Sequence, residues 1–338
     1  MSNAKRTETS HRGPAFDAGV LKEGQARDAA RRLHPLTADS LQIATPAVRT
    51  AFSIVHQVIA QRLPGTNFAG EPRVGKTTAQ NIILKTLKSS FGSIPVGHVL
   101  ATSNSRPSEA LFWADMCQSF KLPVLSIREP KRARNKVVNA IVTQCVAAGS
   151  DVYVLLGDEV QIWEEAEWSF LKDLGNLLGQ EGVRIIHIGF GQHSLHDVKE
   201  RLRASRRIDL IQRFLKKIYT LAGVMNVEEL RRILEQLDNP NFDYPPQSGI
   251  SYTEFFMPAA YAGGWRLANQ ADYFWAGFNT VTRRAANKPA ANVGMGAVML
   301  ALKEFLETCR SEDAPHFQVD AGRWLDAVET TNFAEEVC

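Results

Sequence analysis

The sequence has few features of secreted, metal-binding or membrane-spanning proteins. Its four cysteines include no C-x-x-C pair and lie far apart, at Cys117, Cys145, Cys309 and Cys338. This spacing argues against both a zinc site and a disulfide framework. The longest apolar run, near Val293–Leu302, is interrupted by two glycines and falls short of the ~20 residues that span a bilayer. The first residues also lack the apolar core of a signal peptide. We therefore expect a cytoplasmic protein with no membrane partner.

The chain also has little net charge. Its 39 basic and 36 acidic residues leave +3, so the overall charge predicts neither nucleic-acid nor membrane binding. The distribution is uneven, because segment 128–136 holds five basic residues against one acidic and segment 199–217 holds eight against two. From residue 304 onward, nine acidic residues face two basic ones. Either basic segment could contact DNA phosphates or simply face water. Our candidates for DNA contact are Lys131, Arg132, Arg134 and Lys136.

The sequence does contain a complete match to G-x-x-x-x-G-K-[ST]. This candidate phosphate-binding loop, with the start of its helix, comprises Gly70, Glu71, Pro72, Arg73, Val74, Gly75, Lys76, Thr77 and Thr78. The glycines permit backbone angles that turn successive N–H groups toward one point, and the following helix adds the positive end of its dipole. We expect Lys76 to reach the β- and γ-phosphates of ATP and the Thr77 hydroxyl to ligate Mg²⁺. The alternative is a chance match in a glycine-containing turn.

Two carboxylates follow the apolar segment 151–157. We expect Asp158 to hold the Mg²⁺ shell through water, and Glu159 to orient and deprotonate the water that attacks ATP. Such a pair also arises by chance, but here a complete phosphate loop precedes it. The next predicted strand, 183–188, leads to Gln192 at the carboxyl edge of the sheet, where ligands of open α/β folds bind. We expect Gln192 to sense the γ-phosphate.

Periodicity predicts strands alternating with helices, followed by helices alone. The expected strands are 66–69, 95–102, 151–159 and 183–188. The expected helices are 17–33, 46–63, 77–89, 108–120, 135–148, 168–178, a pair within 197–217, 227–237, 253–261, 266–279 and 296–309. In the acidic end, Trp324, Leu325, Val328 and Phe333 are expected to dock on the chain's own helices, with a partner surface as the alternative.

In order and spacing, these motifs resemble those of AAA+ ATPases, and in detail the TniB/TnsC and IstB-like regulators of transposition. The resemblance covers roughly residues 45–310. Besides the phosphate loop, it rests on Asp158-Glu159-Val160-Gln161, Ile94-Pro95-Val96, Leu111-Phe112, Leu122-Pro123, Phe170-Leu171 with Leu174, Gln212-Arg213-Phe214 and Gly263-Gly264-Trp265-Arg266. The resemblance implies an α/β P-loop NTPase (AAA+) fold, with a central parallel sheet flanked by helices and a small all-helical lid lobe.

The sequence departs from this family in three places. Gly157 stands where a larger apolar residue is usual, Phe190-Gly191 is inserted in the sensor segment, and the proline-rich loop 239–249 is extra. The domains implied by the resemblance are an N-terminal arm and helix (1–44), an ATPase core (45–222), a helical lid (223–310) and an acidic C-terminal tail (311–338).

The resemblance also implies roles for several arginines. Arg213 would be the finger that reaches a neighbour's ATP, with Arg206 or Arg207 as substitutes, and Arg266 would touch the γ-phosphate from the lid. Arginine suits both tasks because its charged fork is rigid and permanent. The alternative is that Arg206, Arg207 and Arg213 form a solvated or phosphate-binding face of a helix.

Two functions therefore stand as hypotheses. The first is an ATP-dependent, Mg²⁺-dependent ATPase of the bacterial cytoplasm that forms a homo-oligomeric ring or filament on double-stranded DNA, without sequence preference. It would link a transposase and a target-selection protein to target DNA, with hydrolysis driving disassembly. The second is an ATP-gated signalling or scaffold protein, for example of a defence or secretion system, with no direct DNA role. Stimulation of ATPase activity by duplex DNA would separate them.

Overall fold

The computed structural model describes residues 18–92, 94–103, 108–123 and 129–337. Packing divides the chain into two units. The sheet unit comprises residues 44–223 and 292–296, and the helical unit comprises residues 1–43, 224–291 and 297–338 as far as these are described. The short segment 292–296 therefore packs with the sheet unit although the chain on both sides of it belongs to the helical unit.

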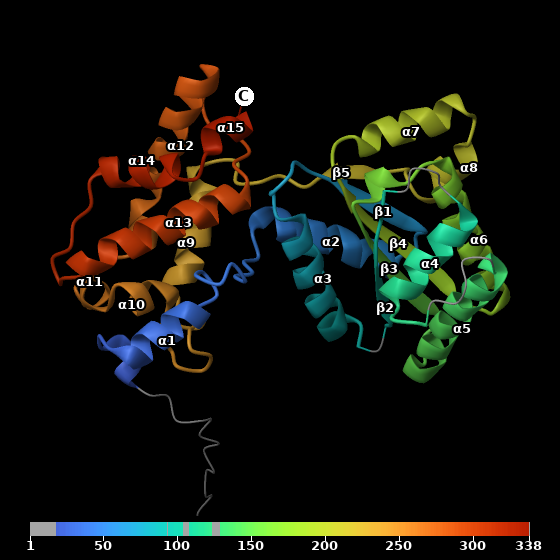
Figure 1. The fold of residues 1–338 in the computed structure, drawn as a ribbon, viewed down its shortest axis with the longest axis horizontal. Coiled ribbons are helices and arrows are strands. Elements are labelled where there is room, and N and C mark those ends of the chain that lie inside the picture. The colour runs from blue at the N-terminus through green and yellow to red at the C-terminus, as the bar shows by residue number, and fades with distance from the viewer. Residues whose placement is uncertain (1–17, 93, 104–107, 124–128, 338) are drawn as a thin grey trace, which may run out of the picture. The chain divides into compact units, whose positions relative to one another are not determined.

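Parallel strands form the central sheet, in the order β2-β3-β4-β1-β5 (Figure 1). They are β1 (Gly65–Ala69), β2 (Val96–Leu100), β3 (Val152–Asp158), β4 (Arg184–Gly191) and β5 (Ile218–Thr220). Parallel pairing requires a crossover between successive strands, so the carboxyl ends of β1, β3 and β4 come together at one edge. The four predicted strands are confirmed. The edge strand β5 was not predicted, because three residues are too few for a periodic pattern.

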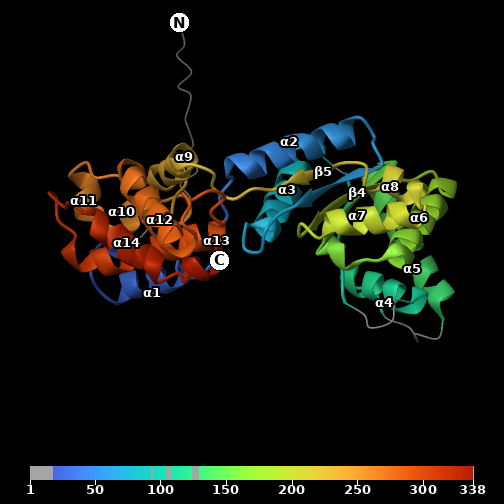
Figure 2. The same cartoon turned by 90° about the horizontal axis from the view of Figure 1, so that it is seen from above.

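Helices cover both faces of the sheet: α2 (Pro46–Ala60), α3 (Lys76–Ser90), α4 (Glu109–Ser119), α5 (Pro130–Ala148), α6 (Glu165–Gln180), α7 (Leu195–Ala204) and α8 (Ile208–Arg213). Helices α2 and α3 lie on one side of the strands, and α4, α5 and α6 lie on the other (Figure 2). Side chains of β3 alternate between these faces: Tyr153 and Leu155 pack with α4–α8, whereas Val154 and Leu156 pack with α2 and α3. Both faces are thus buried, as expected for a parallel sheet. The sequence pattern placed the start of α5 at residue 135, but this helix begins at Pro130 and includes most of the first basic segment.

The helical unit contains η1 (Ala18–Leu21), α1 (Gln25–Leu33), α9 (Val227–Asp238), α10 (Tyr252–Phe256), α11 (Pro258–Ala262), η3 (Leu267–Gln270), α12 (Ala271–Ala286), α13 (Met295–Cys309), η4 (Arg310–Glu312), α14 (Ala321–Glu329) and α15 (Phe333–Val337). The first helix docks on α10, since the buried Arg27 guanidinium donates to the carbonyls of Phe255 and Phe256, both at 3.1 Å. The prediction of one helix over 17–33 was wrong in its first turns, because Gly24 adopts a φ of 148° between η1 and α1.

The C-terminal segment folds onto its own unit. Trp324 of α14 is fully buried, with its ring centroid 3.6 Å from that of Phe305 and 4.2 Å from that of Phe274. Val328 and Phe333 are buried as well. The predicted self-docking is therefore confirmed. No helix within the described part of the chain is long and apolar enough to cross a membrane.

Candidate nucleotide site

The predicted phosphate loop joins the end of β1 to the start of α3. Gly75 has a φ of 105°, in the left-handed region that favours glycine. Gly70 is required for a different reason, since a Cβ atom there would lie 2.6 Å from the carbonyl oxygen of Leu221 and 2.9 Å from Cγ1 of Val74. The Gly70 N–H donates to the Gly191 carbonyl at 3.0 Å. The loop is therefore held tightly against the ends of β4 and β5.

Lys76 stands in the first turn of α3 and is 8 % exposed. Its Nζ donates to the carbonyls of Gly70 (3.2 Å) and Glu71 (3.1 Å), so the ammonium lies inside the loop rather than in solvent. The N–H groups at the start of α3 point the same way, because the first N–H groups of a helix have no partner within it. An ammonium next to unpaired N–H groups at a helix N-terminus is suited to a polyphosphate.

Thr77 and Asp158 are brought together from distant parts of the sequence. Thr77 Oγ1 donates to Asp158 Oδ2 at 3.5 Å, and Asp158 Oδ1 accepts the Glu159 N–H at 3.0 Å. Asp158 is buried at the end of β3, opposite Leu100 of β2. A hydroxyl and a carboxylate are the hard oxygen donors that Mg²⁺ prefers, so this pair fits the expected ion.

Glu159 and Gln192 contact each other, and both also contact Gln161, a residue for which the sequence predicted no catalytic role. Glu159 Oε2 accepts from Gln161 Nε2 at 2.6 Å, and Gln192 Nε2 lies 3.4 Å from the same oxygen. Gln161 belongs to the short helix η2 (Val160–Ile162). The only sequence pointer to it is its place two residues after Glu159, in the quoted motif Asp158-Glu159-Val160-Gln161.

The unusual Gly157 makes room for a buried histidine. A Cβ atom at Gly157 would lie 2.6 Å from Val160 Cγ1 and 3.1 Å from His187 Nε2. His187 is fully buried, and its ring packs edge-on against Trp168 and Phe214. Burial lowers the pKa of His187 to about 3, so its imidazole is neutral. A larger residue at position 157 would displace either this ring or η2, which lies beside the catalytic pair.

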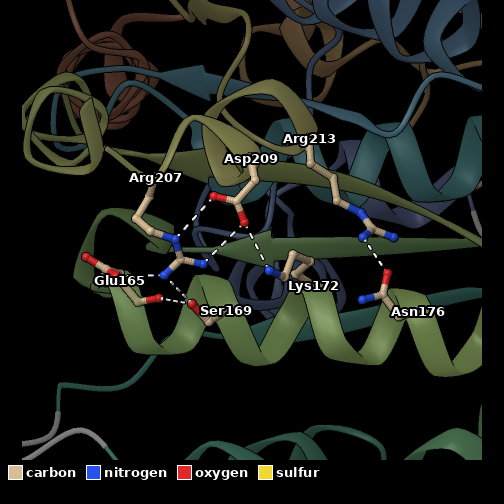
Figure 3. Close-up of polar contacts among 7 residues, drawn as sticks. All are labelled: Glu165, Ser169, Lys172, Asn176, Arg207, Asp209 and Arg213. Carbon is tan, nitrogen blue, oxygen red and sulfur yellow. Dashed lines mark hydrogen bonds and ion pairs between the residues drawn. The ribbon is translucent and has the colours of Figure 1, made fainter. Parts of the chain in front are cut away.

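Arg207, one of the finger candidates, is engaged within its own chain. Its guanidinium donates to Glu165 Oε1 at 2.6 Å, to Asp209 Oδ1 at 3.2 Å and to Ser169 Oγ at 3.0 Å (Figure 3). Lys172 Nζ meets the other oxygen of Asp209 at 3.0 Å. The hydrogen bond from Arg207, and to a smaller extent the one from Lys172, holds the pKa of the Asp209 carboxyl well below its usual value. This network ties the start of α8 to α6.

Arg213, at the end of α8, points toward α6 (Figure 3). Its Nη1 donates to Asn176 Oδ1 at 2.8 Å, and the absent side chain of Gly175 leaves space for Nη2. Burial lowers the pKa of the Arg213 guanidinium, which nevertheless stays charged at neutral pH. Arg206 differs from both, because it is exposed and has no side-chain partner among the described residues.

The remaining predicted residues lie elsewhere. Arg266, in the helical unit, donates to the carbonyls of Tyr261 and Trp265 and covers the Tyr261 ring at 3.6 Å from its centroid. Three of the four DNA candidates on α5 have partners in the chain: Arg132 meets Glu129 at 3.2 Å, Arg134 meets Glu109 at 3.6 Å, and Lys136 donates to the Pro123 carbonyl at 3.4 Å. Lys131 is exposed.

Segment 292–296 contacts the phosphate loop, which no motif had indicated. The Gly296 N–H donates to the Arg73 carbonyl at 3.1 Å, and a Cβ atom at Gly296 would lie 3.2 Å from the Arg73 Cβ. Asn292 Oδ1 accepts the Gly223 N–H at 2.6 Å. The segment includes the first two residues of α13, Met295 and Gly296.

No protein-family profile and no curated protein matches the sequence. Solved structures do match. The ORC2 protein of Aeropyrum pernix, in its ADPNP-ADP complexes, is 14 % identical, with a TM-score of 0.52 over 86 % of this chain and 68 % of that one. Domain III of the Thermotoga maritima replication initiation protein DnaA is 13 % identical, with a TM-score of 0.43 over 88 % of this chain and 97 % of that one.

The fold is the AAA+ type of P-loop NTPase. The likeness to the ORC2 protein and the strand order β2-β3-β4-β1-β5 carry this assignment together, and they confirm the predicted fold class. At 14 % identity the likeness extends to the fold alone.

Proposed function

We propose that this chain is an ATP-hydrolysing, DNA-binding oligomer that links a transposase, together with a target-selection protein, to target DNA in the bacterial cytoplasm. The observation that supports it best is the meeting of Lys76, the Thr77–Asp158 pair and Glu159 at one edge of the sheet. The ADPNP-ADP complexes of the ORC2 protein support nucleotide binding on this fold. The role in transposition rests on the sequence resemblance to TniB/TnsC and IstB-like regulators.

In the proposed reaction, water attacks the γ-phosphorus of ATP in line with its bond to the β–γ bridging oxygen; that bond breaks, ADP leaves and phosphate is released. Lys76 and the loop N–H groups would compensate the phosphate charge, and Thr77 with Asp158 would hold Mg²⁺, which would supply further positive charge to the phosphates. Glu159 accepts a proton from the attacking water. Gln192 would contact the γ-phosphate from the end of β4.

Two arginines complete the proposed site. Arg213 would reach the ATP of a neighbouring subunit, for which it must leave Asn176. Arg266 would approach the γ-phosphate from the lid, for which it must leave the Tyr261 ring. ATP would thus stabilise the ring or filament, and loss of the γ-phosphate would weaken it. Disassembly after hydrolysis follows from this arrangement.

The ATPase proposal is tested with two substitutions. Lys76→Ala should lose nucleotide binding, measured with a fluorescent ATP analogue. Glu159→Gln should still bind ATP and remain assembled while turnover falls roughly 100-fold or more, because the amide cannot accept the proton. Wild-type turnover in Glu159→Gln would mean that another group polarises the water.

The DNA proposal is tested by the salt dependence of binding to unrelated duplexes. If Lys131, Arg132 and Arg134 neutralise phosphates, replacing all three by Ala should flatten the slope of log affinity against log salt by roughly two to three units. Basal ATPase activity should survive. An unchanged slope would move the contacts to segment 199–217, where Arg201, Arg206, Lys216 and Lys217 are exposed.

A specific observation favours the second candidate function, an ATP-gated scaffold without a DNA role. The charges of Arg132 and Arg134 are already compensated by Glu129 and Glu109. Exposed pairs of this kind are weak, so DNA could displace the carboxylates. ATPase activity that duplex DNA leaves unchanged, in a protein that assembles with ATP, would favour the scaffold.

A further inference from the structure

The side-chain amide of Gln161 joins the turn after β3 to the end of β4. Its Nε2 donates to Glu159 Oε2 at 2.6 Å, and its Oε1 accepts the backbone N–H of Gln192 at 3.0 Å. Gln192 Nε2 lies 3.4 Å from the same Glu159 oxygen. One amide thus uses both of its polar ends to connect two residues that the proposed mechanism needs.

Gly191 provides the space for this bridge. A Cβ atom there would lie 2.6 Å from Gln161 Oε1 and 3.4 Å from the Gln161 backbone nitrogen, so a side chain would displace the amide. Gly191 is also paired with Ala69 of β1, and its carbonyl accepts the Gly70 N–H. The sequence departed from the family pattern at Phe190-Gly191, and the Gln161 bridge gives the glycine there a physical reason.

The backbone of Glu159 needs such support. Its φ of 53° and ψ of 33° lie in the left-handed region, which residues with a Cβ adopt at a cost. Conformations of this kind persist where surrounding contacts hold them. Here the Glu159 N–H donates to Asp158 Oδ1, and the Glu159 side chain is held by Gln161.

We propose that Gln161 is a positioning residue for ATP hydrolysis. By donating to Oε2, it fixes the rotation of the Glu159 carboxylate and leaves Oε1 to accept from the attacking water. By accepting from the Gln192 N–H, it ties that orientation to the end of β4. The hydrogen bonds from Gln161 Nε2 and Gln192 Nε2 both end on Oε2, and none within the described part of the chain reaches Oε1 of Glu159. The inference rests on the proposed ATPase function.

Two substitutions separate the two ends of the bridge. Gln161→Glu keeps an oxygen for the Gln192 N–H but replaces the donor with a second carboxylate that repels Glu159, whereas Gln161→Met keeps the length and loses both bonds. The kcat for ATP should fall roughly 10- to 100-fold in both variants, with the Kd for ATP within about twofold of wild type. Amide hydrogen exchange at Gln192 should accelerate in Gln161→Met and stay slow in Gln161→Glu. Gln180→Glu, the same change at the exposed end of α6, is the matched control and should alter neither quantity.

Two kinetic results would overturn the positioning role. The first is a kcat for Gln161→Glu within about twofold of wild type. The second is an equal loss of ATP affinity and kcat, which would indicate a general disturbance of the site. If the wild-type protein bound ATP without hydrolysing it, the proposed function would fail. The Gln192 exchange rate would then test the bridge independently, and unchanged protection in Gln161→Met would show that it does not exist.

Discussion

His187 should make the sheet unit sensitive to acid. Its ring is fully buried among Trp163, Trp168 and Phe214, and burial lowers its pKa from 6.5 to about 3. In the unfolded chain, the imidazole binds a proton once the pH falls below 6.5, whereas the folded chain stays neutral down to about 3. Protons therefore favour the unfolded state. The stability that depends on the neutral His187 imidazole is fully present above pH 6.5 and is lost as the pH falls from 6.5 toward 3.

The expected loss follows from the pKa difference. At a pH of about 5, about one and a half units below the unfolded pKa, the loss is about 2 kcal/mol at about 1.4 kcal/mol per unit. Domains are stable by only about 5–15 kcal/mol, so one residue would remove a measurable share. Gly157 and Gly189 contribute no side chain beside the ring, so a leucine of similar volume should fit at position 187.

The measurement is the free energy of unfolding from native-state amide exchange in β3 and β4, at about pH 7.5 and about pH 5, which follows the sheet unit alone. In His187→Leu, the difference between the two pH values should shrink by about 2 kcal/mol. His196→Leu, the same change at an exposed position on α7, should keep the wild-type difference. If His187→Leu also keeps that difference, the imidazole is protonated or hydrated in the folded protein, and its burial is not the source of the acid sensitivity.

Three further predictions concern other parts of the chain. Trp324→Ala should destabilise the helical unit by about 3–5 kcal/mol in urea unfolding, because it removes the ring stacked on Phe305; a loss below about 1 kcal/mol would show weak tail docking. Mixing Lys76→Ala with Arg213→Ala should restore part of the ATPase activity, and no recovery at any ratio, with both variants co-assembling, would count against a finger acting in trans. Gly157→Ala should cost about 1–3 kcal/mol in thermal unfolding and lower ATP turnover, because it crowds η2 and β4. Unchanged stability and turnover would show that the strand accommodates a methyl group.

Local features were predictable because neighbouring residues specify them. Thr45 caps α2 by accepting the Val48 N–H at 3.2 Å, and Gly149 ends α5 in the left-handed conformation. The continuous apolar run of β3 follows from burial of both sheet faces. The phosphate loop could be recognised because contiguous residues build it. The sequence thus specified the strands before and after the site, the loop between β1 and α3, and the order of elements typical of the AAA+ fold.

Only the tertiary structure decided which distant side chains meet. Gln161 meets Gln192 because η2 folds against the end of β4, and Gly296 meets Arg73 because segment 292–296 packs with the sheet unit. Arg213 meets Asn176 because α8 packs against α6, and the short strand β5 pairs with β1 although the two are far apart in the sequence. Such contacts depend on how strands and helices that are tens of residues apart in the sequence pack together. Local periodicity predicts each element but not its packing partner.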